Sequence, residues 1–267
     1  MFLDESAFIC PLCRQKLFKV GNTLRCLSSH SFDLARHGYV NLLMSNASGK
    51  RHGDDRLMVE ARSRFLSKGY YDVLREAVSA VLGGSNVVLD SGCGEGYYTS
   101  LFEEKNKVIG IDISKDALRV AARRCKTAEF AVASIADIPI GNEAVDVVIN
   151  IFAPDSPDEF MRVLRPNGRL ITVYPMENHL IELKAAIYDK PYTNPTVSLE
   201  RDGMKLISKK EVKYSISLDY NEDILSLFKI TPYYYKTSRE DQQKLEGLDR
   251  LDISLEFMIA EYQKYAP

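Results

Sequence analysis

Three glycines at alternate positions, directly after a short apolar run, constrain this chain more than any other feature. The run at 86–90 has the length and composition of a buried strand, and Gly92, Gly94 and Gly96 follow it in the order G-C-G-E-G. Glycine lets the backbone turn sharply and approach a ligand without a Cβ clash. A strand that enters a helix through such a turn predicts a ligand at the carboxyl end of the strand.

The spacing of the loop separates it from the dinucleotide-binding type. The glycines follow G-x-G-x-G rather than G-x-G-x-x-G, and Asp90 precedes them by two residues. That carboxylate would hold an ammonium group, which a pyrophosphate-binding loop would not favour. Asp112 ends the next apolar run, where a carboxylate can accept hydrogen bonds from both ribose hydroxyls. A ligand with an amino acid at one end and a nucleoside at the other is S-adenosyl-L-methionine, which we therefore expect as the cofactor.

The rest of the chain indicates an α/β fold. Helical segments alternate with further apolar runs, which we expect to be strands at 107–112, 128–134, 145–152 and 168–175. Such alternation, with nearly continuous apolar strand cores, indicates a parallel sheet covered on both faces. We predict the class I S-adenosylmethionine-dependent methyltransferase fold, Rossmann-like, with a mostly parallel seven-stranded sheet. The alternating segment 251–263 predicts a late edge strand, antiparallel to the others.

A cluster of cysteines lies near the N-terminus. The chain has five cysteines, an odd number that makes a poor disulfide framework, and closely spaced thiols more often bind metal. Cys10-x2-Cys13 and Cys26-x3-His30 each supply half of a tetrahedron, and zinc favours thiolate and imidazole ligands. We predict a structural Zn²⁺ site. Free thiols in a turn are the alternative, and His37 is a rival fourth ligand.

The charge of the chain is unevenly distributed. The net charge of −2 argues by itself against an obligate nucleic-acid binder, but residues 1–52 carry +4 and the remainder −6. A basic N-terminal module on an acidic body predicts a polyanion contact at one end. The sequence contains no apolar run of membrane-spanning length and does not start with a basic leader. We therefore expect a cytoplasmic protein without a membrane partner.

These features divide the chain into three parts. They are a zinc-binding RNA-recognition module, a linker with a helical segment, and the methyltransferase domain, at residues 1–37, 38–82 and 83–267. A second helix of the middle part is expected to begin near Tyr71. Arg62, Arg64 and Lys68 of the first helix are expected to add phosphate contacts, with a solvated helix face as the alternative.

Two further strand ends supply candidates. Ser134 follows the third strand, where the adenine would lie, although a plain strand end is the alternative. Asn150 ends the fourth strand, and a turn there can orient a planar amine; Phe152 either stacks on a base or packs in the core. Asp155 is a candidate general base, with a helix cap as the alternative.

Together these motifs resemble one family, the bacterial 23S rRNA guanine-N1 methyltransferases of the RlmA type. The matching segments are C-P-L-C with C-x3-H, H-x-F-D-x-A-x-x-G-Y-V-N-L-L, M-V-x-A-R-x-x-F-L, L-D-x-G-C-G-E-G-Y-Y-T and H-L-x-E-L-K, beginning at residues 10, 30, 58, 89 and 179. The resemblance implies methyl transfer from S-adenosylmethionine to N1 of a guanine in a 23S rRNA hairpin loop. It also implies cofactor contacts from Gly94, Glu95, Tyr71 and His179.

The turn Asn150-Ile-Phe-Ala-Pro154 looks more like the Gram-positive branch associated with tylosin resistance. Two other classes stay open from the residues: a methyltransferase of small molecules or proteins with a structural zinc module, and a non-enzymatic zinc-dependent RNA-binding module on a cofactor-sensing domain. The expected macromolecular partner is 23S rRNA. A homodimer, in which two basic arms grip one RNA hairpin, is the expected assembly.

Overall fold

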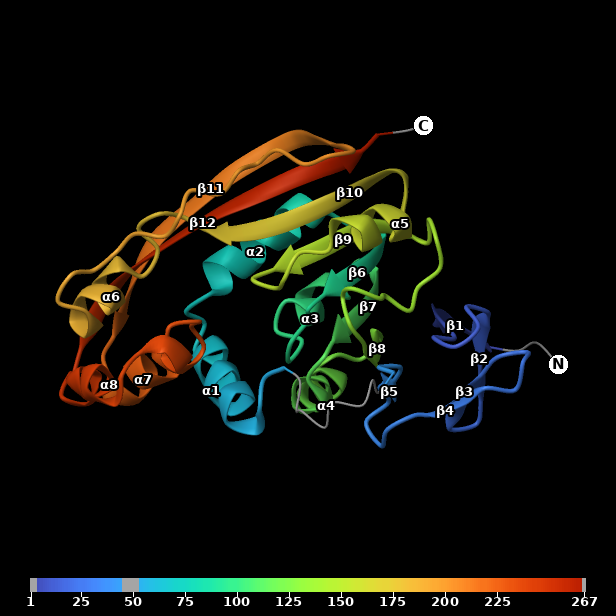
Figure 1. Cartoon of the computed structure of the whole chain (residues 1–267), viewed down its shortest axis with the longest axis horizontal. Helices are drawn as coiled ribbons and strands as arrows, with labels where there is room; N and C mark the ends of the chain where they lie inside the picture. The colour runs from blue at the N-terminus through green and yellow to red at the C-terminus, as the bar shows by residue number, and fades with distance from the viewer. Residues whose placement is uncertain (1–3, 45–52, 266–267) are drawn as a thin grey trace.

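An eight-stranded sheet forms the centre of the protein, and a four-stranded sheet lies beside it at the N-terminal end (Figure 1). The computed structural model describes residues 4–44 and 53–265, so residues 45–52 of the predicted middle part lie outside the described residues. The strand order of the large sheet is β11-β12-β10-β9-β6-β7-β8-β5. The small sheet consists of β1 (Asp4–Ile9), β2 (Lys16–Val20), β3 (Thr23–Arg25) and β4 (Ser31–Asp33).

The parallel part of the large sheet follows the predicted apolar runs. Its strands are β5 (Val40–Asn41), β6 (Val87–Ser91), β7 (Lys107–Asp112), β8 (Glu129–Val132), β9 (Val145–Ile151) and β10 (Leu164–Pro175). The helices between them are α3 (Thr99–Phe102), α4 (Lys115–Arg124) and α5 (Pro157–Val163). The strand order reverses at β6, whose neighbours are β7 and β9. In open α/β sheets, ligands bind in the crevice outside the carboxyl ends of the strands at such a point.

The sheet differs from the prediction in two ways. It has eight strands rather than seven, because Val40–Asn41 pairs in parallel with β8 and adds an edge. The C-terminal segment forms antiparallel β12 (Leu251–Lys264), as predicted, but β12 is not an edge strand, since it pairs with β10 on one side and β11 (Met204–Leu218) on the other. The sequence analysis did not predict β11, because most of its residues are polar and exposed and leave only a weak apolar pattern.

Further helices precede the strand β6 or follow the strand β10 in the chain. Those that precede the sheet are α1 (Arg56–Ser67) and α2 (Asp72–Leu82), so the second helix begins next to Tyr71 as predicted. Those near the C-terminus are α6 (Ile181–Ile187), α7 (Asn221–Lys229), the 3-10 turn η1 (Tyr234–Lys236) and α8 (Arg239–Glu246). In the part of the chain that the structure describes, no helix combines the length and apolar character needed to cross a bilayer.

The small sheet is not an independent arm. Phe8, Leu17 and Leu24 from the small sheet pack in the same apolar cluster as Leu89 and Ile109 from the large one. Burial of apolar area is the main favourable term in folding. The two sheets therefore share a core.

Polar contacts fix the same interface. Glu129 at the start of β8 accepts hydrogen bonds from the Ser6 hydroxyl at 2.9 Å and from the Ala7 amide at 3.1 Å. The Ile9 amide donates to the carbonyl of Pro139 at 2.9 Å. The small sheet thus docks beside the loop that follows β8.

Candidate functional site

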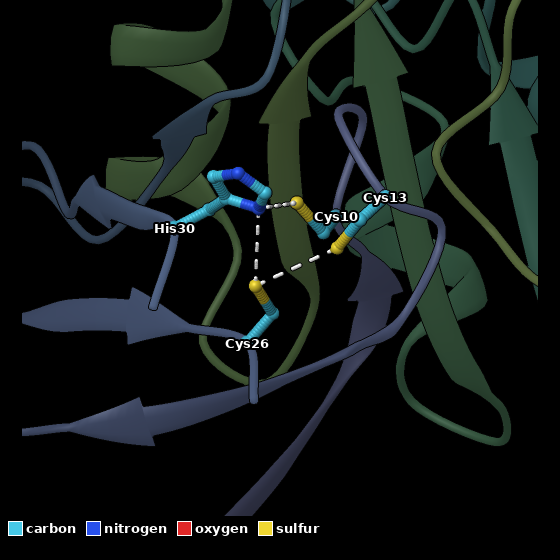
Figure 2. A group of neighbouring side chains, drawn as sticks. All are labelled: Cys10, Cys13, Cys26 and His30. Carbon is cyan, nitrogen blue, oxygen red and sulfur yellow. Dashed lines mark hydrogen bonds between the residues drawn. The ribbon is translucent and has the colours of Figure 1, made fainter. Parts of the chain in front are cut away.

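The four predicted metal ligands converge in the small sheet (Figure 2). Cys10 and Cys13 lie in the turn after β1, Cys26 follows β3, and His30 precedes β4. His30 Nδ1 lies 3.5 Å from Cys10 Sγ and 3.3 Å from Cys26 Sγ, and the two sulfurs of Cys13 and Cys26 are 3.6 Å apart. All four ligand atoms lie within 4.8 Å of one another.

These separations fit a zinc ion. A tetrahedron with Zn–S bonds of about 2.3 Å has edges of about 3.8 Å, close to the separations observed. Four protein ligands leave no open position, so the site is structural rather than catalytic. The rival ligand His37 does not belong to the cluster. The donor set and its geometry therefore support zinc held by Cys10, Cys13, Cys26 and His30.

The glycine loop leaves the carboxyl end of β6 with three residues in the left-handed region. Gly92, Gly94 and Gly96 have φ of +81°, +55° and +76°. A Cβ on Gly92 would lie 2.4 Å from the Cβ of Ala153, and one on Gly96 would lie 3.1 Å from Ala121. A Cβ on Gly94 would meet only Arg62 Nη1, at 3.9 Å. Gly92 and Gly96 thus allow close packing, whereas Gly94 faces the most open space of the three.

The two acids of the pattern lie on either side of this loop. Asp90 is 3% exposed, and its Oδ2 accepts a hydrogen bond from the Thr99 hydroxyl at 2.5 Å. Burial raises the pKa of Asp90 to about 7. Asp112 accepts from the Gly94 amide at 3.0 Å and from the Ser114 amide at 2.7 Å. These bonds hold the Asp112 carboxylate against the loop and leave each of its oxygens a further lone pair.

Glu95 belongs to the loop, between Gly94 and Gly96, and its side chain points into the protein rather than into solvent. Its side chain is buried, and Oε1 has no hydrogen-bond partner among the described residues. Arg124 lies 3.9 Å from that oxygen, as an ion-pair partner at long range. Burial raises the pKa of Glu95, while Arg62 and Arg124 act in the opposite direction. A buried carboxylate oxygen without a hydrogen bond marks a site that a ligand can complete.

An aromatic group lies at the end of β9. Tyr71, Phe152 and Phe257 pack against one another with ring centroids 5.4 to 6.4 Å apart, and the His179 ring lies 4.5 Å from Phe257. Burial lowers the pKa of His179 to about 3, so this imidazole is neutral, and its Nδ1 accepts from the Glu256 amide at 3.2 Å. Phe152 remains 47% exposed, and its φ is +55°.

The sequence analysis missed Phe257. The alternation of β12 places it among buried residues, which indicates a core position but not a position beside His179. Tyr71 and His179, named only through the family resemblance, thus join one cluster with Phe152.

The remaining candidates differ in outcome. Asn150 donates from Nδ2 to the Pro154 carbonyl at 2.8 Å, which closes the turn after β9. Asp155 does not cap α5, because the N-cap residue is Ser156, and the Asp155 carboxylate instead forms an ion pair with Arg201, 2.8 Å from Nη2. That alternative is therefore wrong. Ser134 Oγ accepts from the Ala136 amide at 3.2 Å and stabilises the turn after β8.

Each of the three cations of α1 that were expected to contact phosphate has a carboxylate partner in the structure, and the phosphate contacts themselves stay a prediction. Lys68 pairs with the fully buried Asp223 at 2.6 Å, and Arg64 pairs with Glu222. Both ion pairs join α1 to α7. Arg62 pairs with Asp54 instead and faces the glycine loop.

Two families match this chain. Residues 8–48 match the family described as RlmA, N-terminal, a zinc ribbon, and residues 83–228 match the methyltransferase domain. A crystal structure of the Bacillus subtilis protein YcgJ shares the fold, with a TM-score of 0.51 and 14% identity over 72% of this chain and 98% of that one.

Several relatives match at higher identity, among them the following two. The Bacillus subtilis protein YxjB, named as a 23S rRNA (guanine-N(1))-methyltransferase, is 34% identical over 95% of this chain and 96% of its own length. The 23S rRNA (guanine(748)-N(1))-methyltransferase of Streptomyces fradiae is 39% identical over 67% of this chain and 66% of its own length. The first match spans both the small sheet and the large one.

Proposed function

Since the chain belongs to the family of 23S rRNA (guanine-N(1)) methyltransferases, we propose that it methylates N1 of a guanine in a hairpin loop of the large-subunit rRNA. The protein is an S-adenosylmethionine-dependent enzyme with a structural zinc ion. The observation that carries the proposal is the presence in one chain of the four-ligand zinc cluster and the glycine loop between Asp90 and Asp112.

We propose that the cofactor lies across the carboxyl ends of β6 and β7. When bound, S-adenosylmethionine supplies an electrophilic methyl group on a sulfonium. Asp90 faces its ammonium group, Asp112 accepts from the ribose hydroxyls through its remaining lone pairs, and Gly94 gives the ligand access to the backbone. Ser134, at the end of β8, lies where the adenine is expected, since β8 neighbours β7 in the sheet.

On the other side of β6, the end of β9 is proposed to receive the guanine. Asn150 uses its Nδ2 for the Pro154 carbonyl, so its Oδ1 can accept a hydrogen bond from the base. Phe152 is half exposed and can stack on the ring. Tyr71 packs against Phe152 directly, and His179 packs against Phe257, which contacts Phe152. The turn would thereby place N1 in line with the methyl group, which is the larger part of such catalysis.

Asp155 is less suited to the role of general base. Both of its oxygens are engaged by Arg201, which also donates to the Tyr174 hydroxyl at 2.6 Å. A general base must have an oxygen free to reach the proton it removes, and here both oxygens face the guanidinium. We propose that Asp155 instead fixes the chain that leaves the Asn150 turn.

The zinc module supplies cations for the RNA backbone in this proposal. Lys19, Arg25 and Arg36 are exposed and have no carboxylate partner among the described residues, whereas Lys16 pairs with Glu5. Phosphate contacts of this kind make binding strongly dependent on salt. The division of the chain into residues 1–37, 38–82 and 83–267 stays a proposal. A cytoplasmic location fits an rRNA substrate, and the homodimer stays a prediction.

The position of the guanine is a finer proposal. The Streptomyces fradiae relative is named for guanine 748, and the Asn150-to-Pro154 turn resembles the branch associated with tylosin resistance. We propose the same guanine for this chain.

Transfer of labelled methyl groups to unmodified 23S rRNA fragments tests the function. We expect label on the fragment with the hairpin and at N1 of guanine 748 when the modified nucleotide is mapped. Label only on metabolites would favour the small-molecule class, and cofactor binding without turnover would favour the non-enzymatic class.

A pair of variants tests the division of labour between the two sheets. The double change Lys19→Glu and Arg25→Glu should weaken RNA binding by more than tenfold at moderate salt, because it removes two phosphate contacts. The dependence of RNA binding on salt should fall as well. Binding of S-adenosylhomocysteine should be unchanged. The matched control, Lys209→Glu with Lys210→Glu on exposed β11, makes the same change of charge at the opposite edge of the large sheet. Equal effects of the two pairs would contradict a directed RNA contact.

A further inference from the structure

Arg62 occupies a position that the sequence analysis did not foresee. It lies on α1, yet its guanidinium faces the glycine loop, and it is the closest group to the position that a Cβ would take on Gly94. Its ion-pair partner Asp54 belongs to the segment just before α1, which the Ser114 hydroxyl fixes by donating to the Asp54 carbonyl at 2.7 Å. The start of α1 is thus fastened beside the carboxyl end of β7.

Acidic side chains outnumber basic ones around the glycine loop. Asp54, Glu95 and Asp112 all act on Arg62 electrostatically, and Asp90 lies buried in β6, just before the loop. Such a group of acids attracts the ammonium and sulfonium charges of S-adenosylmethionine but repels its carboxylate. The carboxylate therefore needs a cation in the same small space.

Arg62 is the cation that meets this need. The other nearby guanidinium, Arg124, lies next to Glu95 and over the ring of Tyr97. Arg62 spends one donor on Asp54, and its remaining N–H groups have no hydrogen-bond partner among the described residues. Guanidinium groups present several donors in a planar fork that matches a carboxylate.

We propose that Arg62 is a cofactor-binding residue that pairs with the methionine carboxylate of S-adenosylmethionine. This inference rests on the proposed function, because it requires that cofactor at the glycine loop. Arg62 thereby joins α1 to the cofactor and makes the helix part of the wall of the site.

Calorimetry with two ligands tests the pairing. S-adenosylmethionine and decarboxylated S-adenosylmethionine differ only in the carboxylate. The wild-type protein should prefer the first, and Arg62→Ala should weaken that ligand about 10- to 100-fold, the range for a lost charge-assisted hydrogen bond. Binding of the decarboxylated ligand should change less than about threefold, since it never made the contact.

Two further variants keep the test decisive. Arg62→Lys retains the positive charge but not the planar pair of donors, so its affinity for S-adenosylmethionine alone should fall, by less than in Arg62→Ala. This variant also provides the test if Arg62→Ala does not fold. Arg64→Ala, on the same helix but paired with Glu222, should leave both affinities unchanged. Equal weakening of both ligands by the Arg62 variants, or no weakening of either, would overturn the inference. Failure of the wild-type protein to bind S-adenosylmethionine would instead refute the proposed function.

Discussion

The zinc cluster and the glycine-loop site are built in opposite ways. All four zinc ligands come from one stretch of 21 residues, from Cys10 to His30, and two turns bring them together. The glycine-loop site draws on β6, β7 and the start of α1, and residues from Asp54 to Asp112 contribute to it. A site within one short segment is specified by spacing, whereas a site between elements is specified by the packing of the whole sheet.

The two sites also differ in what supports them. The glycine loop is anchored by backbone hydrogen bonds, since Gly92 and Cys93 both donate to the Ile111 carbonyl, at 2.9 and 3.0 Å. The zinc module has little core of its own and shares its apolar residues with the large sheet. Loss of zinc should therefore affect both regions, while damage to the loop should stay local.

Removal of one zinc ligand should give the largest effect. In Cys26→Ala the remaining three ligands cannot close a tetrahedral site, so bound zinc and rRNA methylation should both be lost. The melting temperature should fall by roughly 5 to 10 °C, because each kcal/mol lost shifts a domain of this size by about 2 to 4 °C. Zinc content and calorimetric melting measure the two outcomes.

Cys125→Ala provides the control, because Cys125 is also buried but lies outside the cluster. It should retain one zinc per chain. If Cys26→Ala lost zinc but melted like the wild-type protein, the shared core would not couple the two sheets, and the small sheet would be an independent arm after all.

A methyl group on the loop should have a smaller and more local effect. In Gly92→Ala the new Cβ would overlap the Cβ of Ala153 at 2.4 Å, and φ of +81° disfavours any L side chain. Displacement of the loop should weaken binding of S-adenosylhomocysteine by about 100-fold, because the loop atoms that hold the ligand are no longer in position. The zinc content should not change. Isothermal calorimetry and metal analysis measure both.

Gly21→Ala is the control for an alanine in the left-handed region outside the cofactor site. Gly21 has a similar φ of +62° in the turn between β2 and β3, but a Cβ there meets nothing within 4 Å. It should cost only about 1 to 2 kcal/mol in the left-handed region and leave the cofactor affinity unchanged. Similar cofactor affinities for the two variants would mean that contact with Ala153 does not shape the site.

The sequence predicted the whole zinc cluster but only part of the glycine-loop site. Spacing was enough for all four zinc ligands, because their approach depends on short turns. The loop and the two acids were also predictable, since each follows an apolar strand directly. Arg62 was assigned to RNA, because helical periodicity shows which residues share a face but not what that face packs against.

The same limit explains the other errors. The interior position of β12 depends on β11, whose polar sequence gives no strand signal of its own. The partner of Asp155 is Arg201, 46 residues further along the chain. Pairings over such distances are set by the assembled sheet, and local pattern does not contain them.

The protonation of Asp90 offers the smallest and most specific test of the loop. Its pKa is raised to about 7 from the ordinary value of 3.8, because burial disfavours the charged form. Below that pH the native carboxyl is neutral and cannot attract the ammonium group of the cofactor. The affinity for S-adenosylhomocysteine should therefore rise about tenfold between pH 5.5 and 7.5, where this group ionises.

The stability of the ligand-free protein should move in the opposite direction. The native state keeps a proton on Asp90 that the unfolded chain has released, so this contribution to stability is fully present below the ordinary pKa and is lost as the pH rises through about 7. Asp90→Asn should abolish most of the pH dependence of affinity and raise the melting temperature at pH 8. A residual slope is expected from Asp112 and Glu95, whose pKa values burial also raises. An unchanged slope in Asp90→Asn would assign the ammonium contact to one of those two acids, whereas no slope in the wild-type protein would place the ammonium group away from all three.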